Sequence, residues 1–422
     1  MTQPTSRPRQ ILIAPWLAWL VISLVMLATA GPTAARAAHG RTGDFTHFWH
    51  AARAMLHGEN IYAATQGRYI YPPLFAFFLQ PLAFLPENIA AVVWVLLNVL
   101  LIVVSVLLVA RVVRHAMLPE LPQLSVSALT ASALLLHADK IRALLSLGQT
   151  DGLMLLAFAL VLVCMKKRPL LAGLAIGASA NIKYVSAIFV PYFLWKRNFR
   201  AAISAMVSFV VFLFLPAVEL GMQRTWEYAR ASLGGLAKLV GLSTTTQGPD
   251  IFEITWDRSV SLTSTFFRAT HALHLPPSFA AVAVVLLFCV TVALVFRLSR
   301  TGERAVYVTD WMALLILALV FSPQTTQRHM VVLVLAYVVA LTMIFSASAR
   351  GQRRALIFAL VLLIAGLTLP PSIRSTQAAL GQWRIIGGTS WCALIFLFVV
   401  LRTQWPSALP KTKQPDSLEP GC

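Results

Sequence analysis

Acidic residues, and charged residues in general, are scarce in this chain. Of its 422 residues only 12% are charged and 58% are hydrophobic, with 15 Asp and Glu against 34 Lys and Arg. This composition excludes an ordinary soluble domain and predicts an integral membrane protein. The net charge of +19 does not indicate a nucleic-acid partner, because the basic residues occur in short clusters between apolar segments, as membrane topology requires.

Cysteine is scarce as well. The four cysteines lie in apolar segments or at the end of the chain: Cys164, Cys289, Cys392 and Cys422. None has a partner at the spacing of a metal site or a loop disulfide, so we interpret them as structural. No Asp-x-Asp pair occurs, and His47 and His50 lack a third ligand at suitable spacing. We therefore expect no cofactor and no metal site at these residues, and the sequence leaves open whether a divalent cation assists.

Long apolar segments dominate what is present. The first, Ile11 to Ala30, follows Arg7 and Arg9 and is long enough to cross a bilayer, so we favour an uncleaved first helix over a signal peptide cut near residues 35–37. Basic clusters recur after alternate apolar segments, which predicts an all-α membrane protein with about twelve transmembrane helices and both termini inside. We expect one domain over residues 1–410, with large outer loops at 32–86 and 219–277, and a disordered cytoplasmic tail over 411–422.

Several of these helices must be short or broken. Only 27 residues separate Arg168 from Lys196 although both lie in cytoplasmic clusters, and two full spans need about 34. We therefore expect two short helices, at 169–181 and 184–195, that meet partway through the bilayer, and the same arrangement for 124–136 and 152–165. Backbone exposed at that depth must face protein or water, so these helices predict a cavity open to the outer face.

The stretch from Gly43 to Pro86 organises the rest of the chain. Its first part has apolar residues at helical spacing, namely Phe45, Phe48, Trp49, Ala52 and Leu56, and Gly58 would end that helix. A helix with an aromatic face just after a span should lie in the membrane interface. It would hold Asp44 within reach of a lipid head group. In the second outer loop, the residues around Trp226 predict a similar interfacial helix, and a polar, less regular stretch follows it.

Five pieces of the chain carry a resemblance to a known family. In order they are GDFTHFWHAARAMLHGENIY, YIYPPLFAFFLQPLAFLP, LLSLGQTDGLMLL, GLAIGASANIKYVSAIFVPYFL and SPQTTQRHMVVLVL, between residues 43 and 335. The chain resembles the polyprenol-phosphate-dependent glycosyltransferases of family 87, in the C-type superfamily. The resemblance implies an all-helical enzyme that moves a hexose, most often mannose, from a polyprenyl-phosphate-sugar donor to a lipid-linked or cell-envelope glycan acceptor. It implies a site on the periplasmic side of the plasma (inner) membrane.

Such a transfer needs a base for the acceptor hydroxyl and cationic or hydrogen-bonding groups for the leaving phosphate. By motif position, Asp44 matches the catalytic Asp of the family and is our candidate base; the alternative is that it only caps the following helix. Lys183, between two short apolar helices, is the strongest phosphate candidate, because an unpaired lysine there is costly unless it reaches the interface or has a function.

The remaining candidates come from the last motifs. The family places a histidine at His329, which with Arg328 would contact the phosphate or orient the acceptor, although this chain has Thr326, Gln327 and Arg328 where some members have an aromatic residue and a second histidine. Gln149 and Asp151 would bind sugar hydroxyls, unless Asp151 is a helix cap. We interpret Tyr71, Pro72 and Pro73 as residues that fix the loop.

Two other classes of function stay open. A secondary transporter or a lipid or glycolipid flippase would also contain broken helices and membrane-embedded charges, but it would usually show two matching halves, and we find no internal repeat. A non-enzymatic lipid-binding scaffold would tolerate substitution of the charged residues. Apart from the membrane lipid, the partners that we expect are the lipid-linked donor and the acceptor, and no nucleic acid.

Overall fold

The computed structural model describes residues 15–118, 125–239, 249–298, 306–347, 349–368 and 374–403. These residues form helices and connecting segments, with an isolated bridge between Ser259 and Thr326 as the β-type pairing in the described part of the chain. The predicted all-α class is therefore confirmed. The predicted tail at 411–422 lies outside the described residues.

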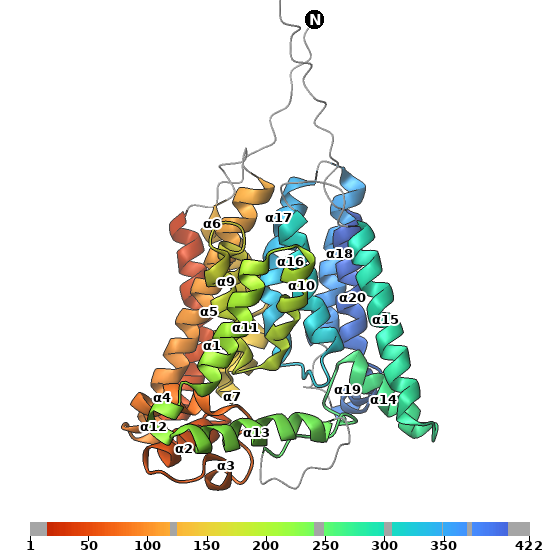
Figure 1. Cartoon of the computed structure of the whole chain (residues 1–422). Helices are drawn as coiled ribbons and strands as arrows, with labels where there is room; N and C mark the ends of the chain where they lie inside the picture. The colour runs from red at the N-terminus through yellow and green to blue at the C-terminus, as the bar shows by residue number, and fades with distance from the viewer. Residues whose placement is uncertain are drawn as a thin grey trace, which may run out of the picture.

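Five helical segments are long and apolar enough to cross a membrane: Pro15–Ala38 (α1), Glu87–Met117 (α5), Phe199–Leu220, Pro277–Leu298 (α15) and His329–Ser346. A bent pair, Ala379–Ile385 with Gly388–Arg402 (α20), would make six. They run side by side with most of the shorter apolar helices in one bundle (Figure 1). These lengths establish a multi-pass membrane protein, and the total of about twelve spans stays a prediction.

The shorter helices occur where the residue arithmetic predicts them. Between the basic residues at Arg168 and Lys196 lie α9 (Pro169–Ala180), a 3-10 turn at Tyr184–Ile188 and α10 (Phe189–Trp195). The other predicted pair is α6 (Val126–Leu136) and α8 (Asp151–Cys164), with a further short apolar helix, α16 (Val306–Phe321), later in the chain. The spacing of the predicted short helices is thus confirmed.

Two glycines explain how closely α9 packs on α11 (Phe199–Phe214). A Cβ on Gly173 would lie 2.3 Å from the Ala201 carbonyl oxygen, and one on Gly177 would lie 2.0 Å from the Ser208 hydroxyl. Glycines four residues apart let two helix backbones approach within a membrane. This contact fixes the end of α9, from which the chain continues into Asn181–Lys183.

The helices that do not follow the bundle direction gather at one end of it (Figure 1). They include α2 (Phe45–Leu56), α3 (Ile61–Ala64), α4 (Pro73–Ala83), α7 (Ala138–Leu147), α13 (Met222–Leu239), α14 (Leu262–Ala272) and α19 (Arg374–Ile385). The short α12 (Ala217–Leu220) instead ends the candidate span that begins with α11. The helix predicted at Phe45 ends as expected, with Gly58 in the left-handed region at φ +69°. A helix around Trp226 is also present as α13, whereas α7 and α14 were not anticipated. That α2 and α13 lie in a membrane interface stays a prediction.

Three features complete the frame. The first helix continues to Ala38, beyond residue 32 where we expected the outer loop to begin, and it contains residues 35–37. Helix α18 (Arg350–Thr368) packs against both α17 (Val334–Ser346) and α20 in the last part of the bundle. A cluster of buried aromatic side chains packs beneath α2 and includes Phe45, Phe48, Trp49, Tyr71, Phe75 and Trp94. This cluster anchors α2 to the start of α5 and so fixes the position of Asp44.

Candidate functional site

A close contact between two glycine-containing turns builds the first part of the site. Gly43 (φ +62°) precedes Asp44, and Gly148 (φ +65°) ends α7 in the left-handed conformation. A Cβ on Gly43 would lie 2.9 Å from the Leu147 carbonyl oxygen, and one on Gly148 would lie 2.8 Å from Phe45 Cβ. The two turns therefore approach at a distance and in a conformation that favour glycine.

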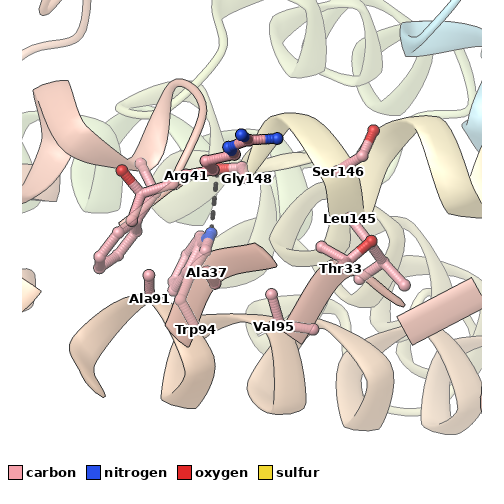
Figure 2. A pocket seen from close by; sticks show the side chains of 11 residues that line it. Thr33, Ala37, Arg41, Ala91, Trp94, Val95, Leu145, Ser146 and Gly148 are labelled. Carbon is pink, nitrogen blue, oxygen red and sulfur yellow. Dashed lines mark hydrogen bonds between the residues drawn. The ribbon is translucent and has the colours of Figure 1, made fainter. Parts of the chain in front are cut away.

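Hydrogen bonds hold this junction in place. The Asp44 backbone N–H donates to the Leu147 carbonyl at 2.8 Å, and the Trp94 indole N–H donates to the Gly148 carbonyl at 3.0 Å. Figure 2 shows the second bond beside a small pocket lined by Trp94, Arg41 and residues of both turns. As a result, Asp44 and Gln149, which are 105 residues apart in the chain, lie side by side.

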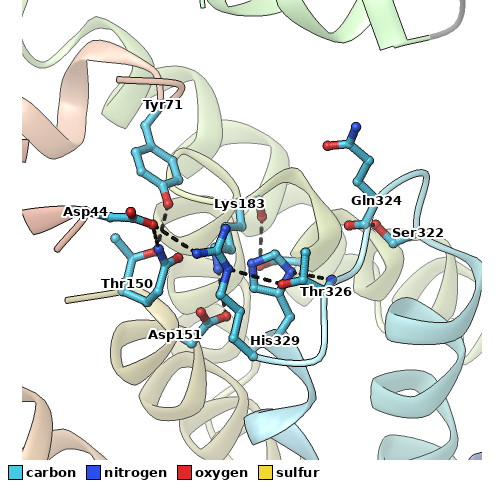
Figure 3. Close-up of polar contacts among 12 residues, drawn as sticks. Asp44, Tyr71, Thr150, Asp151, Lys183, Ser322, Gln324, Thr326 and His329 are labelled. Atoms are coloured by element: carbon cyan, nitrogen blue, oxygen red, sulfur yellow. Dashed lines mark hydrogen bonds and ion pairs between the residues drawn. The ribbon is translucent and has the colours of Figure 1, made fainter. Parts of the chain in front are cut away.

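The Asp44 carboxylate points into the site. Its Oδ2 accepts a hydrogen bond from the side-chain amide of Gln149 and forms an ion pair with Arg328 Nη1 at 3.1 Å (Figure 3). It makes no capping hydrogen bond to the start of α2 within the described structure. The interpretation of Asp44 as only a helix cap therefore lacks its defining contact. The side chains of Asp44 and Arg328 are 36% and 26% exposed.

A second ion pair lies next to the first. Lys183, in the break between α9 and the 3-10 turn, places Nζ 2.7 Å from Asp151 Oδ1. Our expectation of an unpaired lysine was wrong, because the lysine and its partner come from segments whose contact the sequence does not reveal. Asp151 opens α8 but uses its carboxylate for this pair, and its side chain is 3% exposed against 16% for Lys183. Its other oxygen, Oδ2, is buried and has no hydrogen-bond partner among the described residues.

The loop after α16 supplies Arg328 and His329. The Thr326 backbone N–H donates to His329 Nδ1 at 3.3 Å, so the neutral imidazole carries its proton on Nε2 and can donate it. The loop is fixed from two sides. The Val260 N–H donates to the Thr325 carbonyl at 2.6 Å, and His137 Nε2 lies 3.1 Å from the Met330 carbonyl.

The structure thus brings together all six residues that the sequence singled out: Asp44, Gln149, Asp151, Lys183, Arg328 and His329. They come from the α2 start, the α7–α8 turn, the α9 break and the loop after α16. Two carboxylates, a guanidinium, an ammonium group and an imidazole in one place can bind an anion and accept a proton. Their individual roles stay predictions.

Sequence reasoning missed Tyr71, which we expected only to fix its loop. Its hydroxyl accepts a hydrogen bond from the Thr150 hydroxyl at 3.4 Å and faces the same group of residues (Figure 3). Burial raises the pKa of Tyr71, so the phenol keeps its proton and is able to donate a hydrogen bond. Its backbone carbonyl also accepts from Tyr62 at 3.0 Å, which is the loop role that we expected. The signal that the sequence offered was a tyrosine within a family-like motif, directly before two prolines.

The surroundings of the candidate metal ligands can be described for part of the chain. In the part of the chain that the structure describes, no group of three His, Cys, Asp or Glu side chains is arranged to hold a metal ion. His50 lies instead 3.8 Å from Glu87, which also accepts hydrogen bonds from Thr42 and Thr46. The expectation of no metal site and no cofactor is not tested by this observation.

Comparison with known proteins gives one family and two relatives. The model of glycosyltransferase family 87 matches residues 69–323. Two curated relatives are each described as a polyprenol-phosphate-mannose-dependent alpha-(1-2)-phosphatidylinositol mannoside mannosyltransferase. The one from Mycobacterium tuberculosis is 24% identical over 403 residues, which cover 89% of this chain and 88% of the relative. The one from Mycolicibacterium smegmatis is 26% identical over 422 residues, which cover 93% and 91%. No solved structure matches the chain.

Proposed function

Because the chain belongs to glycosyltransferase family 87, we propose that it moves a hexose, with mannose the first candidate, from a polyprenyl-phosphate-sugar donor to a lipid-linked or cell-envelope glycan acceptor. The activity described for the two relatives supports both the donor and the lipid acceptor, and each alignment covers about nine-tenths of both chains. The observation that carries the proposal is the ion pair between Asp44 and Arg328, which lies beside Lys183 and His329.

In the proposed reaction Asp44 is the general base. Its Oδ2 is occupied by Gln149 and Arg328, whereas Oδ1 has no hydrogen bond within the described residues. Oδ1 accepts the proton of the acceptor hydroxyl while that oxygen attacks the anomeric carbon. The bond between the anomeric carbon and the phosphate oxygen breaks, and its electron pair leaves with the lipid phosphate. A single displacement of this kind inverts the configuration of the anomeric carbon.

The leaving phosphate needs donors in place before the bond breaks. Lys183 and Arg328 supply positive charge, and His329 supplies the proton on Nε2 as a hydrogen-bond donor. Gln149 orients the Asp44 carboxylate, and Asp151 holds Lys183. We propose that the site opens toward the extracytoplasmic side, because the basic clusters that mark the cytoplasm follow α5, α8 and α10 in the chain. The site lies instead at the starts of these helices: Glu87 on α5 contacts Thr46, Asp151 opens α8, and Lys183 precedes α10.

The experiment is sugar transfer by purified protein in lipid vesicles, from radiolabelled polyprenyl-phosphate-mannose to phosphatidylinositol mannosides or to a lipid extract of the host. Asp44→Asn retains the size of the side chain and removes the base, so we expect kcat to fall by about 10²–10⁴-fold. Glu59→Gln is the matched control, because Glu59 is an exposed acid on the same outer segment. It should leave kcat within about twofold.

Two results would contradict the proposal. Equal product from wild type and a folded Asp44→Asn protein would remove Asp44 from the role of base. The absence of product from wild type with mannosyl, glucosyl and other polyprenyl-phosphate donors would contradict hexose transfer and favour the transporter or flippase function.

A further inference from the structure

Both cations that the proposed reaction assigns to the donor phosphate already have a carboxylate partner. Arg328 is paired with Asp44 and Lys183 with Asp151, at 3.1 and 2.7 Å. A phosphate that arrives at this site therefore competes with two carboxylates. Whether each carboxylate gives way depends on what separation of its pair would cost, and that cost depends on burial.

Separation of the buried pair is unfavourable. The Asp151 side chain is 3% exposed, and its Oδ2 already lacks a partner among the described residues, so loss of Lys183 would leave a buried carboxylate without compensation. Lys183 has no need to leave, because an ammonium group has three N–H donors and Asp151 accepts from one of them. Lys183 can bind a phosphate oxygen while it stays on Asp151.

Separation of the other pair is far less costly. Asp44 is 36% exposed, so water or an acceptor hydroxyl can replace Arg328 at its carboxylate. Arg328 keeps a second anchor, because its Nε donates to the Thr326 hydroxyl at 3.2 Å. It holds Asp44 through Nη1 alone, whereas a phosphate offers oxygens for two parallel hydrogen bonds from one guanidinium.

We propose that the donor phosphate displaces Asp44 from Arg328 while Lys183 remains on Asp151, so that the base is released only when the donor is bound. This inference rests on the proposed function and adds an order to it: the donor binds first. A carboxylate oxygen that already accepts from a guanidinium has less capacity to accept a hydrogen bond from an acceptor hydroxyl. Removal of Arg328 by the phosphate therefore prepares Asp44 for the acceptor hydroxyl at the step when the sugar is in place.

Replacement of the two carboxylates, one at a time, should then have opposite effects on the affinity for the lipid phosphate. The probe is a polyprenyl phosphate without sugar, titrated onto purified protein in nanodiscs, so that the readout needs no transfer. Asp44→Asn frees Arg328, and we expect the affinity to rise by about tenfold, equivalent to ~1.4 kcal/mol. Asp151→Asn leaves Lys183 without its support, and the affinity should fall by about tenfold or more. Unchanged or weaker binding by Asp44→Asn would overturn the inference.

Two controls distinguish the proposed exchange from a general effect of protein charge on the affinity for polyprenyl phosphate. Glu59→Gln removes one exposed negative charge from the same outer segment and should change the affinity by less than about twofold. In an Arg328→Gln background, Asp44→Asn should give no gain, because the cation that it would release is absent. An equal gain with and without Arg328 would contradict the exchange. Melting temperatures establish that each variant is folded, and Asp44→Ser, which removes the same charge, replaces Asp44→Asn if the latter does not fold.

Failure of this inference differs from failure of the proposed function. If wild type binds polyprenyl phosphate and Asp44→Asn shows no gain, the exchange is wrong and sugar transfer stands. If wild type shows no binding of polyprenyl phosphate, the lipid-phosphate donor fails, and the exchange fails with it.

Discussion

The two ion pairs of the site each join an aspartate to a basic side chain, but their surroundings differ. Asp44 and Arg328 are 284 residues apart in the chain, stand at the ends of loops and are partly exposed. Asp151 and Lys183 are 32 residues apart and lie between apolar helices, with the carboxylate almost fully buried. The difference indicates that burial decides whether a charge pair is a fixed support or a contact that substrate can replace.

The largest expected difference between the pairs is in stability. Lys183→Met should lower the free energy of unfolding by about 3–5 kcal/mol, because it leaves Asp151 as a buried charge without a partner. Arg328→Gln should cost about 1 kcal/mol or less, because water reaches Asp44. Thermal unfolding of both variants in the same nanodiscs measures the difference.

The double variant Lys183→Met/Asp151→Leu is the control for that prediction. It removes both charges together, and it should recover most of the stability lost in Lys183→Met. Equal losses in Lys183→Met and Arg328→Gln would contradict the contrast between the pairs, since burial would then have no influence on them.

Sequence reasoning reached the elements of the site because local patterns encode them. The aromatic spacing from Phe45 and the glycine at Gly58 define α2, and the 27 residues between two basic clusters require the break that holds Lys183. Lys183 was singled out by its position between two short apolar helices, and the other candidates followed from the motifs that resemble the family. The structure then brought them together, which neither composition nor spacing implies.

The sequence did not predict which charged residues form ion pairs with one another. No local pattern shows that Arg328 meets Asp44 or that Lys183 meets Asp151, because each contact depends on how distant helices pack. The same reason hid Tyr71, whose hydroxyl reaches the site only because α2 and α4 share an aromatic core. Burial of Asp151 and exposure of Asp44 are likewise properties of the packed bundle, since both residues stand at a helix start in the sequence.

A smaller change would test whether the exposed pair depends on the glycine junction. Gly148→Ala should lower kcat by up to about 100-fold, because its Cβ would lie 2.8 Å from Phe45 Cβ and displace the base by a fraction of an ångström or more. Lys183 lies outside this junction, so the affinity for polyprenyl phosphate should not weaken. Steady-state transfer kinetics and the binding titration measure the two quantities.

Gly58→Ala is the matched control for the junction. Gly58 also has a positive φ, of +69°, but its Cβ would have only the flexible Arg224 side chain nearby, at 3.8 Å. Gly58→Ala should lower the free energy of unfolding by about 1 kcal/mol, because alanine is strained in the left-handed conformation. Its kcat should stay near that of wild type. Similar losses of kcat in both variants would show that backbone strain, and not the position of Asp44, controls the rate.

The smallest expected effect is a change in the pKa of His47, which tests how far the charge of each carboxylate acts. Burial lowers the pKa of His47, on α2, and the charge of Asp44 opposes part of that shift. Asp44→Asn should therefore lower the pKa of His47 further, so that its neutral form persists to lower pH. The pH dependence of diethyl pyrocarbonate modification at His47, measured by mass spectrometry with His57 as internal reference, follows that neutral form.

Asp151→Asn is the control and should leave the modification curve of His47 unchanged, because Lys183 compensates the charge of the Asp151 carboxylate. A displaced curve in Asp151→Asn would mean that the buried pair acts beyond its own helices, and the contrast between the pairs would fail.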